Sequence, residues 1–140
     1  MEKPLLVIRK SLISERKSVR QVEKILIDFK NKVSISEEIY FKLLIAITEA
    51  VNNAIIHGNR TSSDKIVKLI IEAYENEILV IVSDEGEGFD PDNLEDPRVP
   101  DNLLKESGRG VFIMKEISDS IDFSVTPNGT EVKMQFSLKT

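Results

Sequence analysis

Residues 46–58 read AITEAVNNAIIHG, an apolar helical pattern that several polar side chains interrupt. Four residues turn an α-helix by a little more than one revolution, so Glu49, Asn53 and His57 form one stripe and can meet the same ligand. A carboxylate and an amide oxygen are hard donors that suit Mg²⁺, which binds through one or two protein groups plus phosphates. A solvated helix face that ends at Gly58 explains the same residues, and the segment alone leaves both interpretations open.

The pattern on either side of this helix predicts an α+β domain. The helix is expected to begin near Ser36, whose hydroxyl can cap the first turn, and to end at Gly58. The order of elements indicates a two-layer α/β sandwich, with helices on one face of a mixed, mostly antiparallel sheet. The other expected elements are a strand over 5–8, an amphipathic helix over about 14–31, a hairpin over 66–82, a short helix over about 111–118 and a hairpin over 121–138.

Length and composition narrow the class of protein. A chain of 140 residues fits one domain, so residues 1–140 are taken as a single unit. A net charge of −5 argues against a sequence-independent hold on nucleic acid, which needs clustered Lys and Arg. The chain has no cysteine, so disulfides and thiolate metal sites are excluded. The first apolar stretch, 5–8, is too short for a signal-peptide core or a membrane span, so we expect a cytoplasmic protein without a membrane partner.

A second motif, DEGEGF, covers residues 84–89 and directly follows the first predicted hairpin. Glycines let a backbone approach a flat ring closely, and an ionised Asp84 can accept a hydrogen bond from an exocyclic amine such as that of adenine. Gly and Asp also dominate ordinary turns, so the motif alone does not decide between the two. The segment from Asp84 to Gly110 holds four glycines and three prolines, which predicts an irregular, functional loop.

A third motif, SGRG, covers residues 107–110 and precedes the helix expected from Val111. A glycine-rich loop that leads into a helix N-terminus binds phosphate, because unpaired N–H groups and the helix dipole both favour anions. Arg109 adds a positive charge. A flexible loop before a capped helix accounts for this motif equally well, and Gly129-Thr130 taken alone is an ordinary hairpin turn.

The three motifs together, in this order and spacing, resemble the nucleotide-binding boxes of the ATPase superfamily of gyrase, histidine kinases and MutL (the GHKL superfamily). Gly129-Thr130 stands in the place of the last box. Within that superfamily, EAVNNAIIHGN (49–59), NLL (102–104) and SGRGVFIM (107–114) are most similar to bacterial anti-sigma-factor serine kinases of the partner-switching type. The resemblance covers nearly the whole chain and implies the ATP-binding sandwich known as the Bergerat fold.

The resemblance also implies a role for individual residues. Glu49 would be the general base, Asn53 the Mg²⁺ ligand and Asp84 the adenine anchor. An arginine on the first helix faces the partner protein in this family; Arg20 is the nearest match, with Arg16 close to it. The remaining nucleotide-binding positions would be His57, Gly86, Gly88, Phe89, Ser107, Gly108, Arg109, Gly110 and Thr130.

The function implied by the resemblance is that of an ATP-dependent protein serine kinase and anti-sigma factor. With ATP or ADP and Mg²⁺ as ligands, it would phosphorylate an anti-sigma-factor antagonist, sequester a sigma factor and form a homodimer. A nucleotide-gated binding protein without kinase activity is the alternative, and a domain that has lost its nucleotide is a third. A histidine kinase is disfavoured, because the only histidine, His57, already lies in the nucleotide helix.

Overall fold

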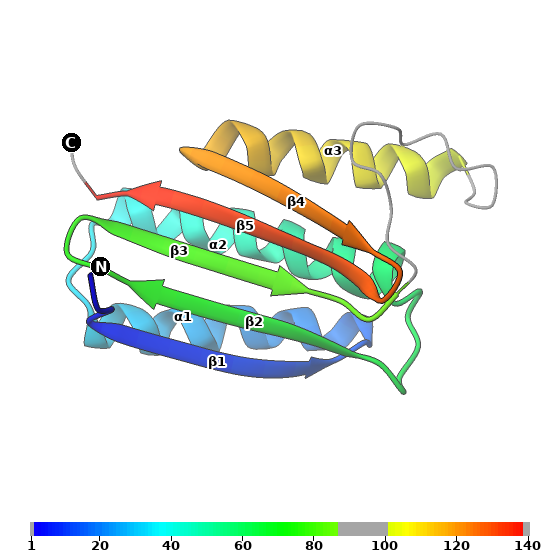
Figure 1. Cartoon of the computed structure of the whole chain (residues 1–140), viewed down its shortest axis with the longest axis horizontal. Helices are drawn as coiled ribbons and strands as arrows, with labels where there is room; N and C mark the ends of the chain where they lie inside the picture. Colours follow the sequence, from blue (N-terminus) through cyan, green and yellow to red (C-terminus); the bar gives the residue numbers. More distant parts are fainter. Residues whose placement is uncertain (1, 87–100, 139–140) are drawn as a thin grey trace.

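The computed structural model describes residues 2–86 and 101–138, which form one sheet covered on one face by helices (Figure 1). The strands lie in the order β1-β2-β3-β5-β4, and all four described pairings are antiparallel. Their bounds are β1 Leu6–Ile13, β2 Ile66–Ala73, β3 Glu77–Ser83, β4 Ser120–Thr126 and β5 Gly129–Ser137. The predicted α+β sandwich is confirmed, and the described sheet is antiparallel throughout, where the prediction allowed a mixed sheet.

The helices lie behind the sheet in Figure 1, and α2 lies between α1 and α3. Their bounds, with a 3₁₀ turn η1 and a π turn η2, are η1 Arg16–Val19, α1 Arg20–Lys32, α2 Glu37–Asn53, η2 Ala54–Gly58 and α3 Asp101–Ile117. Apolar residues at helical spacing explain why one face of each helix turns to the sheet. On α1 that face consists of Val22, Ile25, Leu26 and Phe29, all buried.

The core lies between the helices and one face of the sheet, because alternate strand residues point the same way. On β2 the buried positions are Val67, Leu69, Ile71 and Ala73, while the residues between them are exposed or half-buried. α2 covers this face with a strongly apolar side that includes Leu43, Ala46, Ile47, Ala50 and Val51. The central helix of the nucleotide motif is therefore also the central helix of the core.

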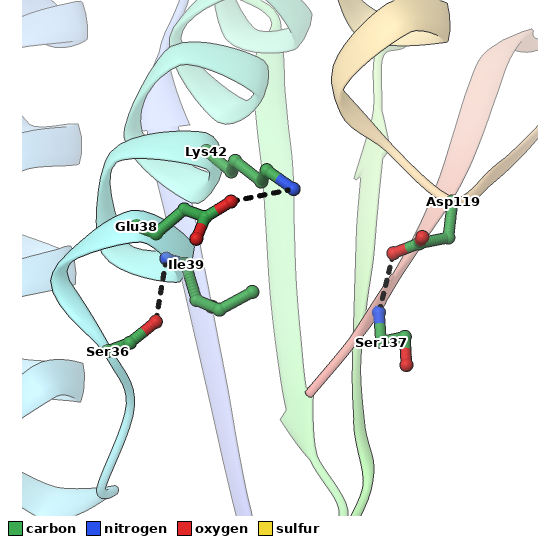
Figure 2. Close-up of polar contacts among 6 residues, drawn as sticks. All are labelled: Ser36, Glu38, Ile39, Lys42, Asp119 and Ser137. Atoms are coloured by element: carbon green, nitrogen blue, oxygen red, sulfur yellow. Dashed lines mark hydrogen bonds and ion pairs between the residues drawn. The ribbon is translucent and has the colours of Figure 1, made fainter. Parts of the chain in front are cut away.

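The N-terminus of α2 lies where the sequence predicts it. Ser36 Oγ accepts a hydrogen bond from the Ile39 N–H at 3.2 Å, and Lys42 pairs with Glu38 at 3.6 Å (Figure 2). A serine cap of this kind stabilises a helix by about 1 kcal/mol. The same view shows Asp119 Oδ2 accepting the Ser137 N–H at 2.6 Å, a bond that joins the end of α3 to β5.

The continuous helical segment Glu37–Gly58 is, by length and hydropathy alone, apolar enough to cross a membrane. Half of its most apolar window is buried inside the fold, and core helices pass the same test. Its apolar side faces the sheet, so the composition of this segment follows from its central place in the core.

Two predicted boundaries near the N-terminus are wrong. β1 continues to Ile13 instead of ending at Ile8, because Arg9, Lys10 and Ser11 are exposed on an edge strand and hide the alternating pattern. The first α-helix begins at Arg20, after the turn η1, and not near residue 14.

A third correction concerns α3, which begins at Asp101 and not at Val111. The irregular segment predicted up to Gly110 is therefore helical over residues 101–110. Glycine costs about 1 kcal/mol relative to alanine within a helix, so Gly108 and Gly110 argued for a loop. The close packing of Gly110 on α2 outweighs that preference.

Candidate functional site

The polar stripe predicted on α2 lines an open cleft of about 320 Å³. Glu49, Asn53 and His57 all border it, as their helical spacing predicts, and their roles toward a ligand stay a prediction. The other lining residues are Arg16 from η1, Asn52 and Ile56 from the same helical segment, and Arg109 and Gly110 from α3. One carboxylate and two guanidinium groups thus share a cleft, which is a suitable environment for phosphate chemistry.

Glu49 is half-buried in the wall of this cleft. Burial raises the pKa of its carboxyl group, and the positive charge of Arg109 opposes part of that rise. Of the ion pairs between described residues, none includes Glu49. A carboxylate with a raised pKa and no ion-pair partner is well suited to accept a proton from a bound substrate.

Asn53 is buried, with 7% of its surface exposed, and its Nδ2 has no hydrogen-bond partner among the described residues. An unpaired buried amide costs about 1–3 kcal/mol, which a ligand could recover. Exchange of the amide oxygen and nitrogen by a flip presents the oxygen that Mg²⁺ needs. Within the described residues no three His, Asp or Glu side chains form a metal cluster, so an ion here would take most of its ligands from phosphate and water.

Gly110 is the point at which α3 lies on these two residues. A Cβ added to it would be 2.9 Å from Glu49 Oε2 and 3.3 Å from both amide atoms of Asn53. A side chain at this position would require the Glu49 carboxylate to move and Asn53 to shift slightly. The sequence had suggested a phosphate cradle at a helix N-terminus, and this detail is wrong here, because Ser107, Gly108 and Arg109 lie inside α3.

Asp84 forms a second centre, at the end of β3. Its Oδ1 accepts the N–H groups of Gly86 at 3.0 Å and Thr130 at 3.1 Å, while its own N–H donates to the Thr130 carbonyl at 3.0 Å. Burial raises the pKa of Asp84, and the two N–H donors oppose part of that rise. Oδ2 accepts no hydrogen bond from the described residues, so it remains available to a ligand amine.

Glycines surround this carboxylate at close range. A Cβ at Gly58 would be 2.1 Å from Asp84 Oδ2, and one at Gly86 would be 1.7 Å from the Gly58 carbonyl oxygen. Gly129 has φ +148°, and a Cβ there would be 2.0 Å from the Asp84 carbonyl oxygen. Three separate segments can therefore meet at Asp84 only because each supplies a residue without a side chain.

A small cavity of about 10 Å³ adjoins Asp84, between α2, α3 and the sheet. Its walls are Ala50, Asn53, Val82, Asp84, Met114, Phe123, Thr130 and Val132. Such a volume holds about one water molecule. Asn53 borders both this cavity and the open cleft, so it joins an apolar pocket containing a buried carboxylate to a polar cleft containing cations. The apolar walls were missed, since Val82 and Met114 read as ordinary core residues.

Asn59 is a second residue that the sequence reasoning missed. It is 1% exposed, and its Nδ2 donates to Ser14 Oγ at 2.7 Å and to the Ile66 carbonyl at 3.1 Å. Its Oδ1 accepts the N–H of Glu85 at 2.7 Å, and Glu85 Oε2 accepts the Ile66 N–H at 2.7 Å. This network holds Glu85, the residue after Asp84, against the end of β1 and the start of β2. The only sequence signal was an Asn placed directly after His-Gly.

Comparisons with known proteins agree with this arrangement. Residues 13–136 match a family model described as "Histidine kinase-like ATPase domain". The chain belongs to this family. An anti-sigma F factor of Clostridium perfringens is 36% identical over 100 residues, which cover 68% of this chain and 70% of that protein. The anti-sigma F factor of Clostridium novyi is 38% identical over 100 residues, 68% of each chain. The serine-protein kinase RsbW of Oceanobacillus iheyensis is 27% identical over 97 residues, 65% of this chain and 61% of that protein.

Solved structures share the fold of this histidine kinase-like ATPase. The RsbU and RsbW domains of a Mycobacterium tuberculosis protein match 96% of this chain with a TM-score of 0.68 at 17% identity, and this chain spans 33% of that one. A blue-light activated histidine kinase of Erythrobacter litoralis matches 87% of this chain with a TM-score of 0.59. These two structures, each 17% identical to this chain, show the fold alone. The anti-sigma F factors at 36% and 38% identity place the chain with them inside the histidine kinase-like ATPase family.

The two cavities account for most of the predicted site of this ATPase. Arg16, predicted beside Arg20 as a partner contact, lines the cleft, whereas Arg20 is exposed at the start of α1 and lines neither cavity; the partner role of both stays a prediction. Gly88 and Phe89 lie outside the described residues. The predicted residues that border a cavity or bond to Asp84 are Glu49, Asn53, His57, Asp84, Gly86, Arg109, Gly110 and Thr130.

Proposed function

We propose that the chain binds Mg-ATP across the two adjoining cavities and transfers the γ-phosphoryl group to a serine of an anti-sigma-factor antagonist. The observation that carries this proposal is the position of Asn53, which borders both cavities. On one side lies the buried carboxylate of Asp84 among apolar walls, and on the other lies Glu49 among cations. The apolar surroundings of Asp84 suit the adenine base, and the cations beside Glu49 suit the phosphates.

The pocket at Asp84 supports binding of the adenine base. Oδ1 is fixed by two backbone N–H donors, which leaves Oδ2 to accept a hydrogen bond from the exocyclic amine. The cavity of about 10 Å³ is far smaller than a purine, so the base enters only when a wall moves. Met114 is the side chain best suited to move, because an unbranched thioether repacks easily and it lies on α3.

The cleft at Glu49 supports binding of the phosphates. Arg109 supplies a fixed positive charge, and the buried amide of Asn53 supplies a ligand atom for Mg²⁺. Bound Mg²⁺ would neutralise charge on the phosphate oxygens. The residues of the chain do the rest: they bind and orient the triphosphate and place a carboxylate beside it.

In the proposed transfer step, Glu49 accepts the proton of the acceptor serine hydroxyl. The serine Oγ forms a bond to the γ-phosphorus while the bond from that phosphorus to the β–γ bridging oxygen breaks, and its electron pair leaves with ADP. The serine proton passes to the Glu49 carboxylate and then to solvent. A raised pKa favours this acceptance, and the positive charge of Arg109 stabilises the phosphate charge.

The proposal also covers the binding partners, the acceptor residue, the oligomeric state and the location of the protein. Two relatives are named anti-sigma F factors and one a serine-protein kinase. By that likeness we assign this chain a sigma factor to sequester, serine or threonine as acceptor, a homodimeric state and a cytoplasmic location. Arg20, exposed at the first position of α1, is the proposed partner contact.

A label-transfer assay tests the proposal. With γ-labelled ATP and a candidate antagonist, Glu49→Gln should lower the transfer rate by about a hundredfold or more and leave the Kd for Mg-ATP nearly unchanged. Asn53→Ala should weaken both binding and transfer. Glu38→Gln is the matched control, because Glu38 lies exposed on the same helix.

Each outcome of this assay is informative. Normal transfer by Glu49→Gln would overturn the assignment of the base. Binding of Mg-ATP by the wild type without transfer to any serine-bearing partner would favour the alternative, a nucleotide-gated binding protein. The small volume of the pocket at Asp84 supports that alternative. An adenine base that displaces Met114 would also change the surface formed by α3.

A further inference from the structure

Arg16 lies in the polar cleft although it is distant in sequence from all three nucleotide motifs. It is the first residue of the 3₁₀ turn η1, which contacts α2. Buried Ser18 anchors this turn, and the neighbouring Lys17 pairs with Glu15 at 3.2 Å. The fold therefore holds the turn in place and directs Arg16 to the cleft that contains Glu49 and Asn53.

Two cations flank the stripe of α2 from different elements. Arg109 belongs to α3 and Arg16 to the turn η1, which leads into α1, and both line the cleft. In Figure 1, α1 and α3 lie on opposite sides of α2. Neither guanidinium takes part in the ion pairs found between described residues, and neither does Glu49. Two guanidinium groups that line one cleft and form no ion pair with a described residue make a site for a multiply charged anion, such as a phosphate.

The order of groups along α2 indicates which phosphate Arg16 would meet. Asp84 marks the base end of the site and Asn53 its middle. Glu49 precedes Asn53 by one helical turn, about 6 Å along the axis, and borders only the open cleft. A triphosphate that runs from the base pocket past Asn53 therefore brings its last phosphate to Glu49, where Arg16 lines the same cleft.

We propose that Arg16 binds the terminal phosphate of the nucleotide and so distinguishes ATP from ADP. This inference rests on the proposed nucleotide function and adds a residue that none of the motifs contains. It replaces the role of partner contact that the resemblance suggested for Arg16. Arg109 reaches the same cleft from α3. The transferred phosphoryl group then lies between the Arg16 and Arg109 guanidinium groups, beside the Glu49 carboxylate that accepts the serine proton.

Calorimetric titration of the full chain with Mg-ATP and Mg-ADP tests this assignment. Arg16→Ala should raise the Kd for ATP about tenfold and change that for ADP less than about twofold, because one charge-assisted contact is lost only with ATP. Arg16→Lys keeps the charge and should recover part of the ATP affinity. Lys17→Ala is the matched control, since Lys17 is exposed next to Arg16 and lines neither of the two cavities.

The outcomes separate this inference from the function on which it rests. An unchanged ratio of ATP to ADP affinity in Arg16→Ala, with wild-type binding intact, would overturn the role of Arg16 alone. A wild type that binds neither nucleotide would overturn both proposals. Equal loss of ATP and ADP affinity would place Arg16 at an inner phosphate and would also refute the assignment. Arg16 is exposed, so unchanged thermal unfolding should accompany every variant.

Discussion

Replacement of Asp84 by asparagine tests the base end of the site with little change in shape. Asp84 uses Oδ1 to accept two backbone N–H groups, from Gly86 and Thr130, and an asparagine oxygen can accept both. Its Oδ2 accepts no hydrogen bond from the described residues. This oxygen is not among their fully buried unpaired atoms, so it keeps some contact with solvent. The substitution therefore changes one atom of the pocket from an acceptor to a donor.

The expected effect on nucleotide binding follows from that exchange. The amine of adenine donates, and in Asp84→Asn it would face a second donor. A hydrogen bond to a charged group contributes about 1.5–3 kcal/mol, so the Kd for ATP should rise about ten- to a hundredfold. Guanine carries a carbonyl where adenine carries this amine, so the variant should lose most of its preference for ATP over GTP.

The effect on stability should be small. The variant removes a buried charge, keeps both bonds at Oδ1 and leaves the new amide in contact with solvent, so the free energy of unfolding at pH 7 should change by about 1 kcal/mol or less. Titrations with ATP and GTP and urea denaturation check both parts. Asp122→Asn is the matched control, because Asp122 is exposed on β4. A folded Asp84→Asn variant with the wild-type ratio of ATP to GTP affinity would refute the placement of the base.

Three further predictions concern the support of this carboxylate. Gly86→Ala should lower the free energy of unfolding by about 1–3 kcal/mol in urea denaturation, because its Cβ would be 1.7 Å from the Gly58 carbonyl oxygen; an unchanged midpoint would contradict that packing. Asn59→Ala should cost about 1–3 kcal/mol by the same measurement, since the buried network at Glu85 loses its centre, and a neutral effect would show that water replaces it. Burial raises the pKa of Asp84, so the folded protein holds a proton that the unfolded chain releases, and the free energy of unfolding should fall as pH rises from about 3.8 through the raised value. Urea titrations at stepped pH should show a smaller fall in Asp84→Asn, and equal pH profiles would contradict the role of this group.

The features that the sequence predicted correctly are those set by local geometry. Helical spacing alone brings Glu49, Asn53 and His57 to one cleft. Ser36 caps α2 because a serine at that position satisfies a free backbone N–H. Short turns joined the strands of both predicted hairpins, and both form. Each of these depends on residues close together in the chain.

The features that the sequence did not predict depend on contacts between distant segments. Two glycines argued for a loop before Val111, yet α3 extends through them because Gly110 fits against Glu49. Arg16 belongs to no motif and reaches the site only because η1 packs on α2. The residue pattern of one helix or turn cannot predict these contacts, because the residue that is contacted lies in another part of the chain.

Gly110 belongs to a local sequence motif and also makes a contact between two distant helices. Its missing side chain lets α3 lie directly on Glu49 and Asn53, the carboxylate and the amide that the phosphate chemistry requires. The same helix brings Met114 into the base pocket and Arg109 into the cleft. A nucleotide that fills both cavities must therefore compete with α3 for these atoms. Glycine lowers the stability of a helix by about 1 kcal/mol per residue, so the part of α3 that covers the site is also the part least costly to unwind.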